Sequence, residues 1–477
     1  MALAHAQPAS LNDLVPLLRQ AGHSGPVHGL SLTDPRGFGP WGGLFLPDPS
    51  IGRWAQWRRP LGAAAFSLIG QIHTLSTPAA QALIQDLVSE PVQPWDALIC
   101  TSTAGRSVVQ ALVADRQDQL LARSGGDRQR LLAQQPQLPV IPLPLEVAKL
   151  QEALPQRAAA RQALALPHEA AVVLWLGRLS LLTKLDPWPA YALLERVAGR
   201  LDRPLVLLEC GPDDSTPQAN HLQQLRQLCP AVRFVRLGGE QPVTETIKHQ
   251  ALASADLALF LVDNPQETFG LAVVEAMAAG LPTVASNWDG YRDLVRHGVD
   301  GLLIDSHWAS SAASLSGVLG WQQFLGLSSF PMTSGALAQL VQLDLRAAEA
   351  AVLALLGDAA MRRAMGAAAR QRALALCDAP VVMARYCALF DELAERRAAA
   401  PAEQRRSQPL PLALDPARLF APFASQTPGA PASAELPEPP VLVRQGREPL
   451  WQLLQAAAPE DQRPSLQADL WAKHHLS

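Results

Sequence analysis

The sequence predicts an α/β fold in which parallel strands are covered by helices on both faces. The pattern is clearest between residues 146 and 308, where short apolar runs alternate with amphipathic stretches. Strands are expected at 170–176, 205–209, 233–236, 257–262 and 283–286, and helices at 191–200, 218–228 and 271–279. Strand and helix alternating at this spacing imply right-handed crossovers, and ligands of such sheets bind beyond the carboxyl ends of the strands.

The composition excludes several classes of protein. Among the 477 residues, 48% are hydrophobic and 17% charged, which is typical of globular domains. Lys and Arg number 39 against 43 Asp and Glu, a net charge of −4, so a nucleic-acid partner is not expected. Five scattered cysteines without a C-x-x-C pair argue against a zinc site or a disulfide framework. With no apolar run of about 18 residues and no signal-peptide pattern, the expected location is the cytoplasm.

The chain divides into four expected parts. Residues 1–145 form a first domain with a helix at 10–20, an irregular stretch at 35–60 and strands at 63–69 and 96–100. Residues 146–400 form a second domain, which contains an insertion at 310–331 and ends in helices at 345–376 and 380–397. Residues 401–440 hold ten prolines and are expected to be a disordered linker. Residues 441–477 form a tail of short helices, either partly ordered, which we favour, or a segment that docks a protein.

The loop after the first strand of the second domain carries two cations. Gly177 permits a sharp exit from the strand, and Arg178 and Lys184 follow before the next helix. Two cations can neutralise a diphosphate, and the chain contains only four lysines. An ordinary solvated loop is the alternative interpretation of this motif taken alone.

The stretch DNPQETFGLAVVEAMAAGLP places two carboxylates around a helix start. Glu267 lies in the loop and Glu275 lies on the helix, so both can face one cleft. The amides of Phe269, Gly270 and Leu271 lie at the start of the helix and carry positive potential. Carboxylates accept hydrogen bonds from paired hydroxyls, although two helix-surface glutamates are the alternative for this motif alone. Cations for phosphates and carboxylates for diols together describe a site for a nucleotide sugar.

These motifs resemble those of the retaining family 4 glycosyltransferases, which have the GT-B fold. The family's G-R…K loop matches Gly177, Arg178 and Lys184, and its E-x7-E motif matches Glu267 and Glu275. The resemblance is strong from about 170 to 308 and weaker over the helices at 345–397. It implies two Rossmann-like domains facing a cleft, with the C-terminal helices returning to the first domain and a Pro-rich tail behind them.

The resemblance implies a role for each motif in a metal-independent transfer with retention from a UDP- or GDP-type sugar. Arg178 and Lys184 would hold the diphosphate, Glu275 the ribose, and Glu267 the hexose-type sugar. The donor-binding set further comprises Gly177, Gly238, Thr268, Phe269, Gly270 and Leu271. No separate cofactor is expected, and the acceptor is open: a glycan, a lipid or a small molecule.

The first domain matches the family less well. His73 in FSLIGQIHTLST follows a strand, like the family's acceptor-side histidine, and it joins Arg178, Lys184 and Glu267 as an expected catalytic residue. A turn histidine is the alternative. The family's opening strand and glycine-rich loop are not recognisable, because the first residues lead directly into a helix and GPWGG at 39–43 follows no clear strand. Either the start is truncated or the acceptor domain is reduced.

Three further alternatives stay open. A non-catalytic homologue could keep the nucleotide site and act as a binding partner, and a phosphorylase or an epimerase could share the fold. The segment RWAQWRRP at 53–60 combines Arg and Trp, so contact with the inner face of a membrane is an alternative to packing at a domain edge.

Overall fold

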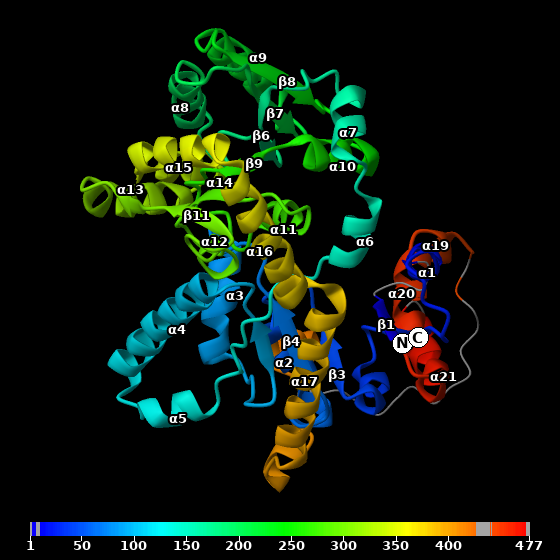
Figure 1. The fold of residues 1–477 in the computed structure, drawn as a ribbon. Helices are drawn as coiled ribbons and strands as arrows, with labels where there is room; N and C mark the ends of the chain where they lie inside the picture. The colour runs from blue at the N-terminus through cyan, green and yellow to red at the C-terminus, as the bar shows by residue number, and fades with distance from the viewer. Residues whose placement is uncertain (1, 6–9, 426–438, 440, 474–477) are drawn as a thin grey trace. The chain divides into compact units, whose positions relative to one another are not determined.

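The computed structural model describes residues 2–5, 10–425, 439 and 441–473. The chain forms two compact units (Figure 1). The first comprises Met1–Trp41, Arg59–Leu61 and Gln408–Ser477, and the second comprises Gly42–Arg58 and Gly62–Ser407.

The first unit contains a small parallel sheet and short helices. Strand β1 (Ala2–His5) pairs with β2 (His28–Ser31) in parallel register. The remaining elements are α1 (Ser10–Gln20), η1 (Pro35–Trp41), η2 (Arg59–Leu61), η4 (Leu412–Leu414), α18 (Pro416–Leu419), η5 (Ala421–Phe423), α19 (Val441–Gln445), α20 (Glu448–Ala457), η6 (Glu460–Gln462) and α21 (Arg463–Ala472). The helix at 10–20 is confirmed. The expectation that no strand precedes this helix is wrong, because β1 is completed by a partner more than twenty residues along the chain.

The expected linker and tail are described in part. Residues 426–438 and 440 of the linker lie outside the described residues, and its described part contains short 3-10 turns and the single helical turn α18. In the tail, α20 buries Trp451 and leaves Leu453 and Leu454 exposed. The division of the chain at 401 and 441 stays a prediction.

The second unit begins with a three-stranded parallel sheet in the order β3 (Gly43–Phe45), β4 (Ser67–Gln71) and β5 (Ala97–Ile99). Its helices are α2 (Ile51–Arg58), α3 (Pro78–Ser89), α4 (Thr103–Ser124) and α5 (Arg128–Ala133). Residues 35–60 were expected to be irregular and instead contain β3 and α2. The reason is tertiary: the guanidinium of Arg58, at the end of α2, donates to both carboxylate oxygens of fully buried Asp96 at 2.7 and 2.8 Å.

The second unit continues into a six-stranded parallel sheet in the order β11-β10-β9-β6-β7-β8. Its strands are β6 (Ala171–Leu176), β7 (Leu205–Cys210), β8 (Val232–Leu237), β9 (Leu257–Phe260), β10 (Thr283–Ser286) and β11 (Gly301–Ile304). Its helices include α6 (Val147–Ala153), α7 (Arg157–Ala163), α8 (Trp188–Ala198), α9 (Thr216–Gln227), α10 (Glu245–Ser254), α11 (Leu271–Ala278) and α12 (Tyr291–Leu294). Figure 1 shows α8 and α15 on one side of this sheet and α7 and α10 on the other. The predicted parallel α/β architecture is confirmed.

The segment expected as an insertion is helical. A short antiparallel pair, β12 (Ser306–Trp308) and β13 (Val341–Leu343), holds α13 (Ala312–Phe324) and α14 (Phe330–Ala338) between its strands. The following helices are α15 (Leu345–Gly357), α16 (Ala359–Cys377) and α17 (Ala379–Ala398), and η3 (Ala402–Arg405) comes after them. The expected helix at 345–376 is therefore two helices, because Asp358 caps α16 by accepting hydrogen bonds from the amides of Ala360 and Met361.

Helix α17 packs against the three-stranded sheet. Its Tyr386, Leu389 and Leu393 share a core cluster with Ile69 of β4 and Ile99 of β5. The chain thus returns from the six-stranded sheet to the three-stranded one within this unit. Over the ranges that the structure describes, no helix is long and apolar enough to cross a membrane.

Candidate active site

Three neighbouring strands of the six-stranded sheet each end in a glycine. Gly177, Gly211 and Gly238 follow β6, β7 and β8 with φ angles of +137°, +155° and +111°. A Cβ atom on Gly211 would lie 2.0 Å from the carbonyl oxygen of Gly177, and one on Gly238 would lie 2.3 Å from that of Gly211. The strand ends are packed so closely that side chains do not fit between them, which leaves backbone at this edge. Sequence reasoning selected Gly177 and Gly238 and missed Gly211, although it also follows a buried strand directly.

Lys184 and Glu267 come from different strand ends and meet at this edge. The Lys184 Nζ lies 2.5 Å from the Glu267 Oε2, and both side chains are largely buried. The Tyr291 hydroxyl donates to the same carboxylate oxygen at 3.2 Å. The amides of Thr268 and Phe269 donate to the other oxygen at 3.3 and 3.4 Å. The loop after β6 and the loop before α11 are thereby joined at one point.

The surroundings of Glu267 favour its charged form. Burial raises the pKa of Glu267, but Lys184, the Phe269 amide and the Tyr291 hydroxyl together lower it below its ordinary value. The carboxylate is therefore ionised at neutral pH and acts as a hydrogen-bond acceptor.

Glu275 has a different partner. Its Oε1 lies 2.8 Å from the Nζ of Lys248 on α10, which also pairs with Glu245 at 2.9 Å. Glu275 is nearly buried, and it does not contact Glu267 in any described interaction. Sequence reasoning missed Lys248, although it is one of only four lysines in the chain.

Arg178 lies at the open side of the strand ends. Its Nη1 is 3.6 Å from the Asp214 Oδ1, and 42% of its side chain is exposed. A second arginine, Arg236 of β8, donates to the carbonyl of Gly211 at 2.5 Å and to Asp213 at 2.8 Å. Arg236 thus fixes the turn after β7, a role that no sequence motif indicated.

His73 follows β4 and is exposed. Its carbonyl, and not its ring, makes the contact across the site, by accepting a hydrogen bond from the Thr268 Oγ1 at 2.7 Å. Thr101, after β5, donates to the Thr268 carbonyl at 3.1 Å. Thr268 therefore connects the end of the three-stranded sheet to the loop that carries Glu267.

Gly270 shapes the start of α11. Its φ angle is +107°, and a Cβ atom there would lie 2.3 Å from the Tyr291 ring. Phe269 is buried on one side of it and Leu271 is partly exposed on the other. The amides of Thr268 and Phe269, which donate to the Glu267 carboxylate, lie just before this turn.

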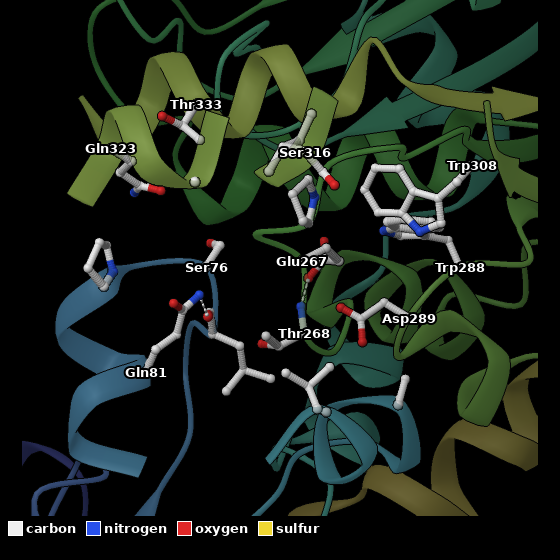
Figure 2. A pocket seen from close by; sticks show the side chains of 18 of the residues that line it. Ser76, Gln81, Glu267, Thr268, Trp288, Asp289, Trp308, Ser316, Gln323 and Thr333 are labelled. Carbon is white, nitrogen blue, oxygen red and sulfur yellow. Dashed lines mark hydrogen bonds between the residues drawn. The ribbon is translucent and has the colours of Figure 1, made fainter. Parts of the chain in front are cut away.

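A cavity of about 790 Å³ opens beside Glu267 and Thr268. Figure 2 shows Ser76 and Gln81 on one side of it and Ser316, Gln323 and Thr333 on the opposite side. Its apolar lining includes Leu75, Val108, Trp288, Trp308, Trp321 and Phe324. The volume is in the range of small-molecule sites.

Asp289 borders this cavity in an uncommon conformation. Its φ angle is +44°, and its Oδ1 accepts a hydrogen bond from Ser102 at 3.4 Å. Burial, and then the charge of Glu267, raise the pKa of Asp289 to about 8. This carboxyl is mostly protonated at neutral pH. Nothing in the local sequence distinguishes it from a surface aspartate.

Asp263 is a second carboxyl with a raised pKa near the strand ends. Burial raises its pKa to about 7, and the Asp186 amide donates to its Oδ2 at 3.4 Å. Within the described part of the chain, no group of three or more His, Cys, Asp and Glu side chains is arranged to hold a metal ion.

Comparison with known proteins connects this geometry to a family. Residues 156–319 match the model of "Glycosyl transferases group 1". D-inositol 3-phosphate glycosyltransferase of Thermobispora bispora is 35% identical over 33% of this chain and 38% of its own length. The enzyme of that name from Nocardia farcinica is 30% identical over 59% of this chain and 58% of its own length. The chain thus spans between about two fifths and three fifths of these curated relatives.

The fold is similar to that of solved structures. The N-terminal domain of Candida albicans trehalose-6-phosphate phosphatase superposes with a TM-score of 0.51 at 9% identity, over 82% of this chain and 89% of that one. At this identity the likeness concerns the fold alone. The family match runs from α7 into the first part of α13 and includes Gly177, Lys184, Glu267 and Glu275. Through residues 156–319, the chain is thus similar to the glycosyl transferases group 1.

Proposed function

We propose that the protein is a retaining glycosyltransferase that moves a hexose-type sugar from a nucleoside diphosphate sugar of the UDP or GDP type to an acceptor hydroxyl. The ion pair between Lys184 and Glu267 carries this proposal, because it unites the G-R…K loop and the E-x7-E motif at one strand edge. The family match over the same residues supports it.

Each group has a proposed task. Lys184 and Arg178 bind the diphosphate, and Lys184 exchanges part of its contact with Glu267 for the phosphate oxygens. Glu275, held by Lys248, accepts hydrogen bonds from the ribose, and the edge formed by Gly177 and Gly238 lines the nucleotide. Glu267 and the amides of Phe269, Gly270 and Leu271 orient the sugar.

The proposed transfer breaks the bond between the anomeric carbon and the diphosphate oxygen. The acceptor oxygen forms the new bond on the same face of the sugar, and its proton passes to the departing phosphate. Lys184 and Arg178 stabilise the charge that develops on the leaving group, so the step needs no metal ion from the protein. We place the enzyme in the cytoplasm.

A non-catalytic homologue is the second candidate. The observation that favours it is His73, which is exposed and whose ring does not line the cavity beside Glu267. Such a homologue would bind a nucleotide without releasing free sugar or transferring it. The protein can be incubated with a nucleoside diphosphate sugar that carries the base found to bind. Detection of the free nucleoside diphosphate then separates the two candidates.

Thermal unfolding with UDP, GDP, ADP and TDP tests the proposal. A ligand at one hundred times its dissociation constant stabilises a protein by about 2.7 kcal/mol, which shifts the midpoint measurably. We expect a shift with one nucleotide that is lost in Lys184→Ala and kept in Lys149→Ala, since Lys149 pairs with Glu146 on an exposed surface. No shift with any of the four would contradict the proposal.

A further inference from the structure

We infer that the acceptor carries an apolar chain and that α13 and α14 bind this chain. The inference rests on the proposed function, because it assigns the acceptor end of the same site. It specifies a class of acceptor that the strand-end motifs leave open.

The position of the cavity separates it from the expected phosphate site. Glu267 and Thr268 line it, whereas Gly177, Arg178 and Glu275 do not. A sugar oriented by Glu267 would therefore have the diphosphate on one side and this cavity on the other. The group that enters the cavity is the acceptor.

Aromatic side chains form much of the cavity wall. Trp288 and Trp308 meet edge to face with ring centroids 5.6 Å apart. Trp321 and Phe324 of α13 are stacked at 5.1 Å, yet they are 61% and 70% exposed. When an apolar ligand removes such side chains from water, the burial of their apolar surface contributes favourably to the binding free energy.

The charges of the lining do not suit an anionic acceptor. Among the described residues that line the cavity, Arg292 is the only cation, and Glu267 and Asp289 are carboxyl groups. A phosphate group is usually bound by several cations or by free amides at the start of a helix. The start of α4 lines the cavity, but the amides of Thr103 and Gly105 already donate to the side chains of Asp293 and Ser102. Because the pKa of Asp289 is raised to about 8, the wall beside Trp288 is close to neutral at pH 7.

The insertion that carries α13 and α14 is anchored to the six-stranded sheet. Ala338 and Ser334 of α14 are buried, and the Ser334 Oγ donates to the side chain of Asn264 at 2.7 Å. Exposed apolar side chains extend beyond the cavity on the same segment, at Leu315, Val318, Leu325 and Leu327. These side chains provide further exposed apolar surface on the segment that carries α13.

Calorimetric titration with alkyl β-glucosides of increasing chain length, from methyl to octyl and below their micelle concentrations, tests the inference. We expect each added methylene to raise the affinity about threefold to fourfold, as burial of apolar groups predicts. In Trp321→Ala/Phe324→Ala the octyl compound should bind about tenfold more weakly, with the methyl compound unchanged. Trp188→Ala is the control, because this aromatic side chain is exposed outside the cavity.

An affinity that does not depend on chain length, or a dependence kept in full by the double variant, would overturn the inference. Saturable binding of inositol 3-phosphate at the same site would also overturn it. Nucleotide-induced thermal shifts are measured on the same preparations. A wild-type protein without a nucleotide shift contradicts the proposed function, whereas a normal shift with a flat alkyl series contradicts only the acceptor inference.

Discussion

The strand-end edge and the cavity wall formed by α13 and α14 differ in how far their side chains have partners within the protein. At the edge, the charged groups are paired with one another, as in Lys184 with Glu267 and Lys248 with Glu275. At the wall, Trp321 and Phe324 lie open to water. A preorganised edge suits a reaction in which every donor presents the same diphosphate, and an open apolar wall suits the selection of an acceptor.

Among substitutions in these two regions, the largest effect should come from breaking the glycine edge. In Gly238→Ala the new Cβ would lie 2.3 Å from the Gly211 carbonyl oxygen at a φ angle of +111°, so backbone must move. We expect the free energy of unfolding to fall by about 3 kcal/mol, measured by urea denaturation. Gly239→Ala is the matched control, because nothing lies within 4 Å of its Cβ position. Equal stability of the two variants would show that the edge is not tightly packed.

The charged pair at the edge should matter for transfer more than for folding. Glu267→Gln keeps the shape of the side chain but removes the charge that Lys184 faces at 2.5 Å. We expect the transfer rate to fall by about tenfold to a hundredfold, because a charge-assisted hydrogen bond contributes roughly 1.5–3 kcal/mol. Glu349→Gln, at the exposed pair with Arg196, serves as the control. A rate equal to that of the wild type in Glu267→Gln would remove Glu267 from the mechanism.

The stability of the protein should depend on pH through Asp289, which lines the cavity beside Glu267. Its pKa is raised to about 8 in the folded protein, so the folded state holds this proton more tightly than the unfolded state. The stability that it contributes is present below pH 4 and is lost as the pH rises through about 8.

Asp289→Asn removes this dependence, and asparagine tolerates the positive φ angle. Thermal midpoints from pH 5 to 9 should therefore fall more steeply for the wild type than for the variant, corresponding to about 1 kcal/mol or more. Parallel curves would contradict the raised pKa. Asp263, whose pKa of about 7 is also raised, is present in both proteins and cancels in the comparison.

The smallest effect is expected at the wall. Trp321→Ala should change the free energy of unfolding by less than about 0.5 kcal/mol, because the side chain is 61% exposed. By contrast, Trp175→Ala in β6 should cost about 3–5 kcal/mol, since that side chain is buried in the core. Urea denaturation of both variants checks this. A large loss in Trp321→Ala would mean that the wall supports the fold and is not an open ligand surface.

The sequence by itself determined the strands of the second unit and the residues at their ends. Runs such as AVVLWL are buried at all six positions, so their local composition specifies a central strand of a parallel sheet. Gly177 follows such a run directly, Lys184 and Glu267 lie in the loops after two of them, and the carboxyl ends of parallel strands meet at one edge. The order of the chain predicts that they lie at the same edge of the sheet, and the pairing of Lys184 with Glu267 is seen only in the structure.

The tertiary structure alone decided the rest. Strand β1 forms because it pairs with β2. The pKa of Asp289 is raised because its side chain is buried and close to the charge of Glu267. Gly211 is required by the carbonyl of Gly177, a neighbour from another strand. Trp321 lines a cavity only because α3, α4 and α14 contribute other parts of its wall. In each case the deciding contact joins residues far apart in the chain, and no local pattern records such a contact.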